Sequence, residues 1–197
     1  MLWKVCFGTK KRTIGLQCPE GLLSTQTGRS RLLNGAMEIR PITESDAESF
    51  QQALGAVAAE RKFLLTLKAP PLESIKAFIH NNVSKGYPQF VAESESRVIG
   101  WADFVPVEKE SLLHTAHLGM GVLKEFRGKG VGSALLSSVT EAAIHAGFTR
   151  LELEVFANNV AAVTLYEKHG FEHEGTKRQA RIIDGKYIDA LIMSRIL

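Results

Sequence analysis

One short stretch, residues 122–133, limits more than any other what this chain can fold into, because it places a glycine-rich loop between a strand-like run and a helix-like run. Glycine occupies every second position of the loop, at Gly128, Gly130 and Gly132. Glycines leave backbone N–H groups unobstructed, and the helix behind them presents unpaired donors and the positive end of its dipole. Arg127 and Lys129 add positive charge. Together these features predict an anion site, most naturally for a pyrophosphate.

Three phosphate-binding patterns compete for this loop. A P-loop needs G-x-x-x-x-G-K-[ST], which is absent, and a dinucleotide-binding fingerprint needs a third glycine where Ser133 stands. The spacing fits R-x-x-G-x-G instead, from Arg127 to Gly132. A nucleotide-dependent enzyme is disfavoured, because neither a Walker lysine nor a magnesium carboxylate is in place. The alternative that needs no ligand is a glycine-rich turn with solvated charges.

A second constellation lies at residues 159–171, where Asn159, Ala162 and Tyr166 are spaced to share one helix face. That face offers an amide, a small residue that allows close approach, and a phenol. Taken alone, the tyrosine is as well explained by a place in the hydrophobic core.

The pattern of apolar residues predicts a mixed α/β fold with a mostly antiparallel sheet and at least one crossover helix. Strands are expected at residues 38–42, 88–94, 97–105, 112–123, 149–155, 171–181 and 186–195. Helices are expected from a Thr43–Asp46 capping signal to about residue 60, and over residues 70–85, 130–146 and 159–169. Gly119 and Gly121, inside a strand, indicate a bulge or close approach by another group.

Residues 1–36 differ in composition from the rest of the chain. They hold six Lys/Arg and one acidic residue, whereas residues 37–197 hold 18 basic and 20 acidic residues. Both cysteines, Cys6 and Cys18, also lie in this first segment. We interpret residues 1–36 as a basic, flexible extension, with a targeting segment as the less favoured reading, and residues 37–197 as one domain. Met37 is an alternative start.

Composition excludes several classes of protein. The near-neutral domain argues against a nucleic-acid surface. No apolar run reaches the roughly 18 to 20 residues of a membrane span, and no secretory signal is present, so we expect a cytoplasmic protein. Two cysteines cannot supply a four-ligand zinc site, and we expect no metal.

The two motifs together resemble the GNAT superfamily of acetyl-CoA-dependent N-acetyltransferases. The matching residues are R-G-K-G-V-G at 127–132 and N-x-x-A-x-x-L-Y-E-K-x-G-F at 159–171, and the resemblance covers about residues 38–197. It implies an α/β (α+β) GNAT fold, with six to seven strands and about four helices, splayed between the fourth and fifth strands. It also implies acetyl-CoA as acyl donor and a primary amine as acceptor.

The resemblance assigns roles to individual residues. The residues that would hold acetyl-CoA are Met120, Gly121, Val122, Arg127, Gly128, Lys129, Gly130, Val131, Gly132, Ser133, Asn159 and Ala162. Backbone of residues 120–122 would pair with the pantetheine arm, and backbone N–H groups of residues 128–133 would hold the pyrophosphate. Tyr166 would protonate or hydrogen-bond the departing thiolate.

The base that takes the amine's proton is open between Glu154, at the matching spot of a catalytic glutamate in some family members, and His117, on the strand that meets the thioester. His114 has less support, and the base could also be water-mediated. For the acceptor, Trp101 and Asp103 share a strand face and could meet an ammonium. Arg178 and Arg181 could read a carboxylate.

Several functions remain open at this point. The first is acetylation of a small amine, such as an amino acid or a xenobiotic. The others are acetylation of a protein N-terminus, as in a ribosomal-protein-like acetyltransferase, and a non-catalytic acyl-CoA sensor. A homodimer through the sheet edge or the final hairpin is plausible.

Overall fold

The computed structural model describes residues 30–32 and 37–197. The strands are β1 (Ser30–Leu32), β2 (Met37–Pro41), β3 (Gln89–Ser94), β4 (Arg97–Pro106), β5 (Thr115–Val122), β6 (Arg150–Phe156), β7 (Glu172–Ile183) and β8 (Lys186–Ile196). The helices are α1 (Ala47–Ala59), α2 (Leu72–Lys85), α3 (Val131–His145) and α4 (Val160–Lys168). Short 3-10 turns are η2 (Glu44–Asp46), η3 (Glu110–Leu112) and η4 (Lys124–Phe126).

The strands form one sheet in the order β1-β2-β3-β4-β5-β6-β8-β7. All neighbours are antiparallel except β5 and β6, which are parallel. This confirms the predicted mixed, mostly antiparallel fold, to which β1 adds an edge strand. β1 lies within the segment predicted as an extension; the rest of that segment, with both cysteines, lies outside the described residues.

Local signals set the element boundaries. Thr43 and Asp46 form the predicted capping box before α1, with the Thr43 backbone N–H donating to Asp46 Oδ2 over 2.8 Å. Gly86 ends α2 in the left-handed region, with a φ of 67°. Asp184 and Gly185, both at positive φ, make the tight turn between β7 and β8.

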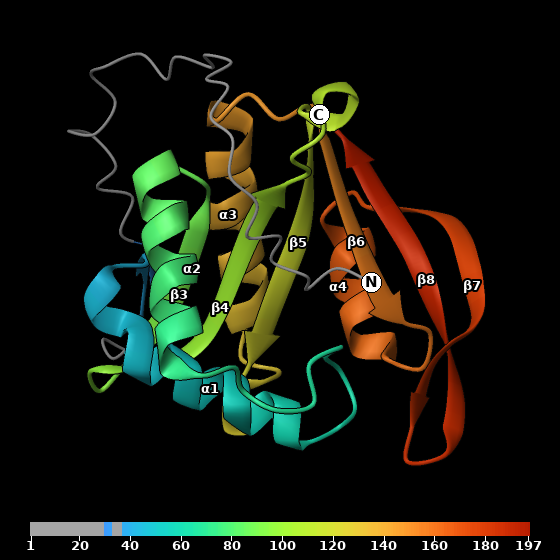
Figure 1. Ribbon diagram of the computed structural model, residues 1–197, viewed down its shortest axis with the longest axis horizontal. Coiled ribbons are helices and arrows are strands. Elements are labelled where there is room, and N and C mark those ends of the chain that lie inside the picture. The colour runs from blue at the N-terminus through green and yellow to red at the C-terminus, as the bar shows by residue number, and fades with distance from the viewer. Residues whose placement is uncertain (1–29, 33–36) are drawn as a thin grey trace.

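Helices cover both faces of the sheet, with α1 and α2 on one face and α3 and α4 on the other (Figure 1). On the first face, the Phe50 ring of α1 meets the Trp101 ring of β4 edge-on, with centroids 5.5 Å apart. On the second face, Leu135 of α3 packs against Gly100 of β4. Apolar side chains from both layers and the sheet make one core, in which Phe104, Leu135 and Leu151 are fully buried.

The sheet opens between β5 and β6. Their pairing covers only residues 115–117 of β5, from Thr115 opposite Arg150 to His117 opposite Glu152. β4, on the other side of β5, pairs with it as far as Val122. One backbone edge of residues 118–122 therefore has no strand partner, and Figure 1 shows β5 and β6 diverging from their common end. This is the splay that the family resemblance implies.

Candidate active site

The glycine loop leads into α3 beside the splay. Gly128 and Gly130 adopt left-handed backbone conformations, with φ of 72° and 82°, and Gly130 is the N-cap of α3. A Cβ at Gly132 would lie 3.3 Å from Leu165 of α4, so a side chain there would press the two helices apart. The backbone therefore requires glycine at these positions, and the first N–H groups of α3 are left clear for an anion.

Arg127 braces the loop. Its Nη1 donates to Glu60 Oε2 over 2.8 Å, its Nε donates to the Val122 carbonyl over 2.8 Å, and its guanidinium stacks 4.8 Å from the Phe63 ring centroid. The hydrogen bond from Arg127 lowers the pKa of Glu60. The predicted anion ligand thus ties the loop to the end of α1, and only its backbone stays available to a phosphate. Lys129 is exposed, with Nζ 5.5 Å from the Phe126 ring centroid.

Helix α4 lies along the first turn of α3. Ser133 Oγ is 2.8 Å from His169 Nε2, a residue that sequence reasoning did not single out. Burial, and secondly the charge of Arg195, lower the pKa of His169. Asn159 caps α4, its Oδ1 accepting from the Ala162 backbone N–H over 3.3 Å. The cap uses the amide oxygen and leaves the amide NH₂ free to donate to a ligand.

Tyr166 is buried in α4, 8% exposed, and its ring meets Phe171 edge-on with centroids 6.0 Å apart. Burial raises the pKa of its phenol well above the usual range. The phenol therefore keeps its proton at any physiological pH and serves as a hydrogen-bond donor.

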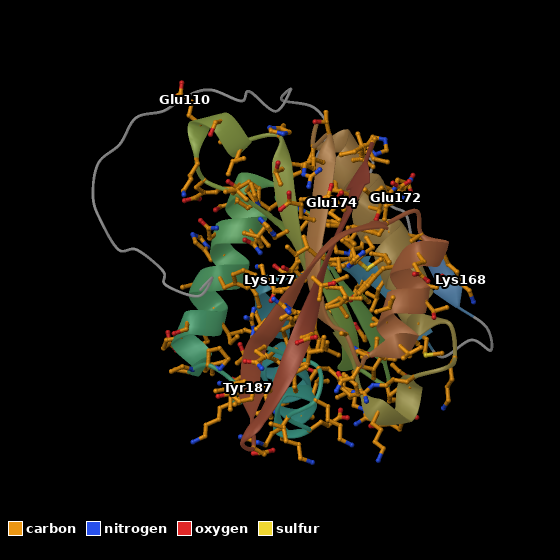
Figure 2. All side chains as sticks on the ribbon, turned by 90° about the vertical axis from the view of Figure 1, so that its right-hand side faces the viewer. Glu110, Lys168, Glu172, Glu174, Lys177 and Tyr187 are labelled. Carbon is orange, nitrogen blue, oxygen red and sulfur yellow. The ribbon has the colours of Figure 1, made fainter. Side chains whose placement is uncertain are left out.

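The two predicted bases differ in their surroundings. Glu154 accepts from Lys177 Nζ over 2.6 Å and from Arg181, so both carboxylate oxygens already hold a cation. Figure 2 shows Lys177 on β7, at the side of the sheet that carries Glu174. His117 is the last β5 residue paired with β6, and its Nε2 lies 3.4 Å from Glu152. Of the two, His117 stands at the start of the splay with its ring partly exposed.

Trp101 and Asp103 share one face of β4, as predicted, but both are buried. The Trp101 ring, 3% exposed, fills the space over Gly121 of β5 and packs on Phe50, so it belongs to the core. Asp103 is 6% exposed and pairs in register with Gly119. Burial raises the pKa of its carboxyl to about 8. Arg178 is exposed on β7.

These features fit an acyl-CoA. The unpartnered edge of residues 118–122 can take an extended amide-bearing arm as a strand neighbour takes it. The clear N-terminus of α3 can take the pyrophosphate. None of the described residues forms a group of three or more His, Cys, Asp or Glu that could hold a metal ion. In the same part of the chain, no helix is long and apolar enough to span a membrane.

Comparison with known proteins agrees with this geometry. A model of the acetyltransferase (GNAT) family matches residues 58–171. L-amino acid N-acetyltransferase AaaT of Escherichia coli is 33% identical over 112 residues, which are 56% of this chain and 69% of that protein.

Solved structures share the fold. Ribosomal-protein-alanine N-acetyltransferase from Brucella melitensis superposes with a TM-score of 0.76 at 29% identity, over 81% of this chain and 99% of that one. A phosphinothricin acetyltransferase from Sinorhizobium meliloti, in complex with acetyl-CoA, does so with a TM-score of 0.77 at 22% identity, over 82% and 89%. The family match, the splayed strands and the glycine loop agree: the chain belongs to the acetyltransferase (GNAT) family and is an acetyl-CoA-dependent acyltransferase.

Proposed function

We propose that this chain acetylates the primary amine of a small molecule, an amino acid or a xenobiotic amine, by direct attack in a ternary complex. The observation that carries the proposal is the buried carboxyl of Asp103 beside the splay, on the face opposite the glycine loop. Such a group suits an ammonium. The amino acid acetyltransferase and the phosphinothricin acetyltransferase among the relatives support a small amine as acceptor.

Acetyl-CoA supplies an activated acyl thioester. The backbone N–H groups of residues 128–133 would hold its pyrophosphate, and the free edge of residues 118–122 would pair with its pantetheine arm. The amide NH₂ of Asn159 would donate to the same arm. Tyr166, which keeps its proton, would donate its phenolic hydrogen to the departing sulfur.

The acceptor would approach from the face that carries α1 and α2, where Asp103, His117 and Glu152 lie. Its ammonium would meet the Asp103 carboxylate. His117, beside Glu152, is the base candidate from sequence that the surroundings favour, because Lys177 and Arg181 already occupy Glu154.

A second candidate is acetylation of a protein N-terminus, favoured by the 29% identity to the ribosomal-protein-alanine acetyltransferase. A backbone N-terminal amine presents the same ammonium. It differs in the peptide that follows, which needs an open channel where a free amino acid needs a carboxylate partner.

The test is acetylation by the full chain of twenty amino acids, polyamines, an aminoglycoside, a phosphinic amino acid and N-terminal peptides. Products are detected by mass spectrometry, which the thiols of Cys6 and Cys18 do not disturb. We expect turnover on a small amine and at least a tenfold fall in Tyr166→Phe. Turnover on peptides alone would establish the second candidate. Tight CoA binding by calorimetry with no turnover would overturn both in favour of a sensor.

A further inference from the structure

Asp103 is a buried carboxyl group with no partner. Its residue is 6% exposed, and within the part of the chain that the structure describes no hydrogen bond or ion pair reaches its oxygens. An unpaired charge in a protein interior is strongly disfavoured, so buried carboxylates are normally paired or hydrogen-bonded. Asp46, the other buried carboxylate among the described residues, follows that rule through Arg40 and Thr43. Asp103 breaks it, which marks the position as a candidate for function.

The position of the carboxylate is informative as well. A Cβ built on Gly119 would lie 2.9 Å from Asp103 Oδ1 and 3.1 Å from Oδ2. The carboxylate therefore lies over β5, the neighbouring strand, and glycine at 119 is what leaves room for it. Gly119 comes two residues after His117, where pairing with β6 stops. Because adjacent strands are about 4.8 Å apart, a carboxylate over β5 lies about one strand spacing from any chain seated in the splay.

The surroundings of Asp103 are almost uncharged. On β3 the residue opposite it is Gln89, whose Oε1 accepts from Asn82 of α2 over 2.9 Å and whose buried Nε2 has no partner among the described residues. On β4 and α1 the neighbouring side chains on this face are the Trp101 and Phe50 rings. On β5 the nearest titratable group is His117, diagonal to Asp103 in the register. A cation brought by a ligand would be the first to face this carboxylate directly.

We propose that Asp103 is the general base of the acetyl transfer, taking the proton of the acceptor ammonium. This inference rests on the proposed function and deepens it, because the carboxylate that binds the ammonium then also deprotonates it. One amine proton passes to Asp103 and on to solvent. The N–C bond forms as the C–S bond breaks, the sulfur keeps the bonding electron pair, and it takes the second amine proton.

Chemistry at neutral pH calls for such an environment. A base works best when its pKa lies near the operating pH, and burial holds the pKa of Asp103 near 8. An ordinary aspartate would be too weak a base to deprotonate an ammonium. Glu154, which Lys177 and Arg181 hold, lacks a free oxygen for the task.

The test is the pH dependence of kcat/KM for two acceptor amines of different pKa, with the full chain and the isosteric variant Asp103→Asn. In the wild type we expect an acidic limb with its midpoint near 8 for both amines, because the limb reports the enzyme. In Asp103→Asn we expect a fall of about 100- to 1000-fold at pH 7.5. The midpoint then moves to the pKa of each amine, since only the free base can attack.

Glu154→Gln is the matched control, a carboxylate-to-amide change on the same sheet face, and it should keep the midpoint near 8. Calorimetric binding of CoA should stay within about twofold in Asp103→Asn, which shows an intact fold independently of activity. If Asp103→Asn does not fold, the smaller Asp103→Ser replaces it with the same expectation.

Two results would overturn the inference. One is an Asp103→Asn enzyme that keeps both its rate and the limb near pH 8. The other is loss of that limb in His117→Gln while Asp103→Asn retains it. A wild type that acetylates no amine would instead refute the proposed function, so the two failures are distinguishable.

Discussion

Asp103 should make the stability of this protein fall as pH rises, and Asp103→Asn should remove that dependence. Its folded-state pKa is about 8, against an ordinary value of 3.8. A carboxyl whose pKa is raised by folding favours the folded state only while it is protonated. Its ionisation therefore costs nothing below pH 3.8, costs more at each pH above it, and reaches its full cost above pH 8.

The magnitude follows from the shift. At 1.36 kcal/mol per unit, ionisation in the unfolded chain costs the native state about 2 kcal/mol at pH 5 and about 4 kcal/mol at pH 7. Asp103→Asn keeps the shape and removes the charge, so it should be more stable than the wild type by about those amounts at each pH. With a urea m-value of about 2 kcal/mol per molar, the midpoint at pH 7 should rise by about 2 M.

The assay is urea unfolding of both proteins at pH 5, 7 and 9, followed by far-UV circular dichroism. The difference between the two midpoints isolates Asp103, because every other titrating group is common to both proteins. A difference that does not change with pH would refute the reasoning. It would mean that Asp103 is ionised and stabilised by a contact at all three values.

The remaining predictions concern the glycines and the phenol. Gly130→Ala places a side chain at a φ of 82°, so it should destabilise the protein by about 1 kcal/mol and weaken acetyl-CoA binding by calorimetry. Gly121→Ala would put its Cβ 2.7 and 2.9 Å from two Trp101 ring carbons, and urea unfolding should show a loss of about 1–3 kcal/mol that Trp101→Leu partly restores. Tyr166→Phe should lower kcat at least tenfold with unchanged KM for acetyl-CoA, whereas a larger change in KM would mean that the phenol binds rather than donates.

The order and type of the elements could be predicted because their signals are local. A cap such as Thr43–Asp46 and a turn such as Asp184-Gly185 act within a few residues, and the structure has both where the sequence places them. β1 was not predicted, because three residues without alternating polarity carry no strand signal of their own. It exists through its pairing with β2.

The glycine loop and the α4 face were likewise readable, yet the partners of their side chains were not. Glu60 lies 67 residues before Arg127, and His169 lies 36 residues after Ser133. The cations on Glu154 come from β7, 23 and 27 residues along the chain. Side-chain partners over such separations depend on how the sheet is assembled, which periodicity does not encode. A carboxylate can therefore be placed on the correct face without its availability being known.

Gly119 and Gly121 show how a correct signal can point to an unforeseen cause. Glycine inside a strand indicates close approach by another group, and here β4 supplies that group at both positions: the Asp103 carboxylate over Gly119 and the Trp101 ring over Gly121. The strand that borders the splay thus contributes no side chain to this face between residues 118 and 122. Groups that act there must come from β4, one strand away. A search for the base along β5 and β6, where His117 and Glu154 lie, passes over the residue that the geometry favours.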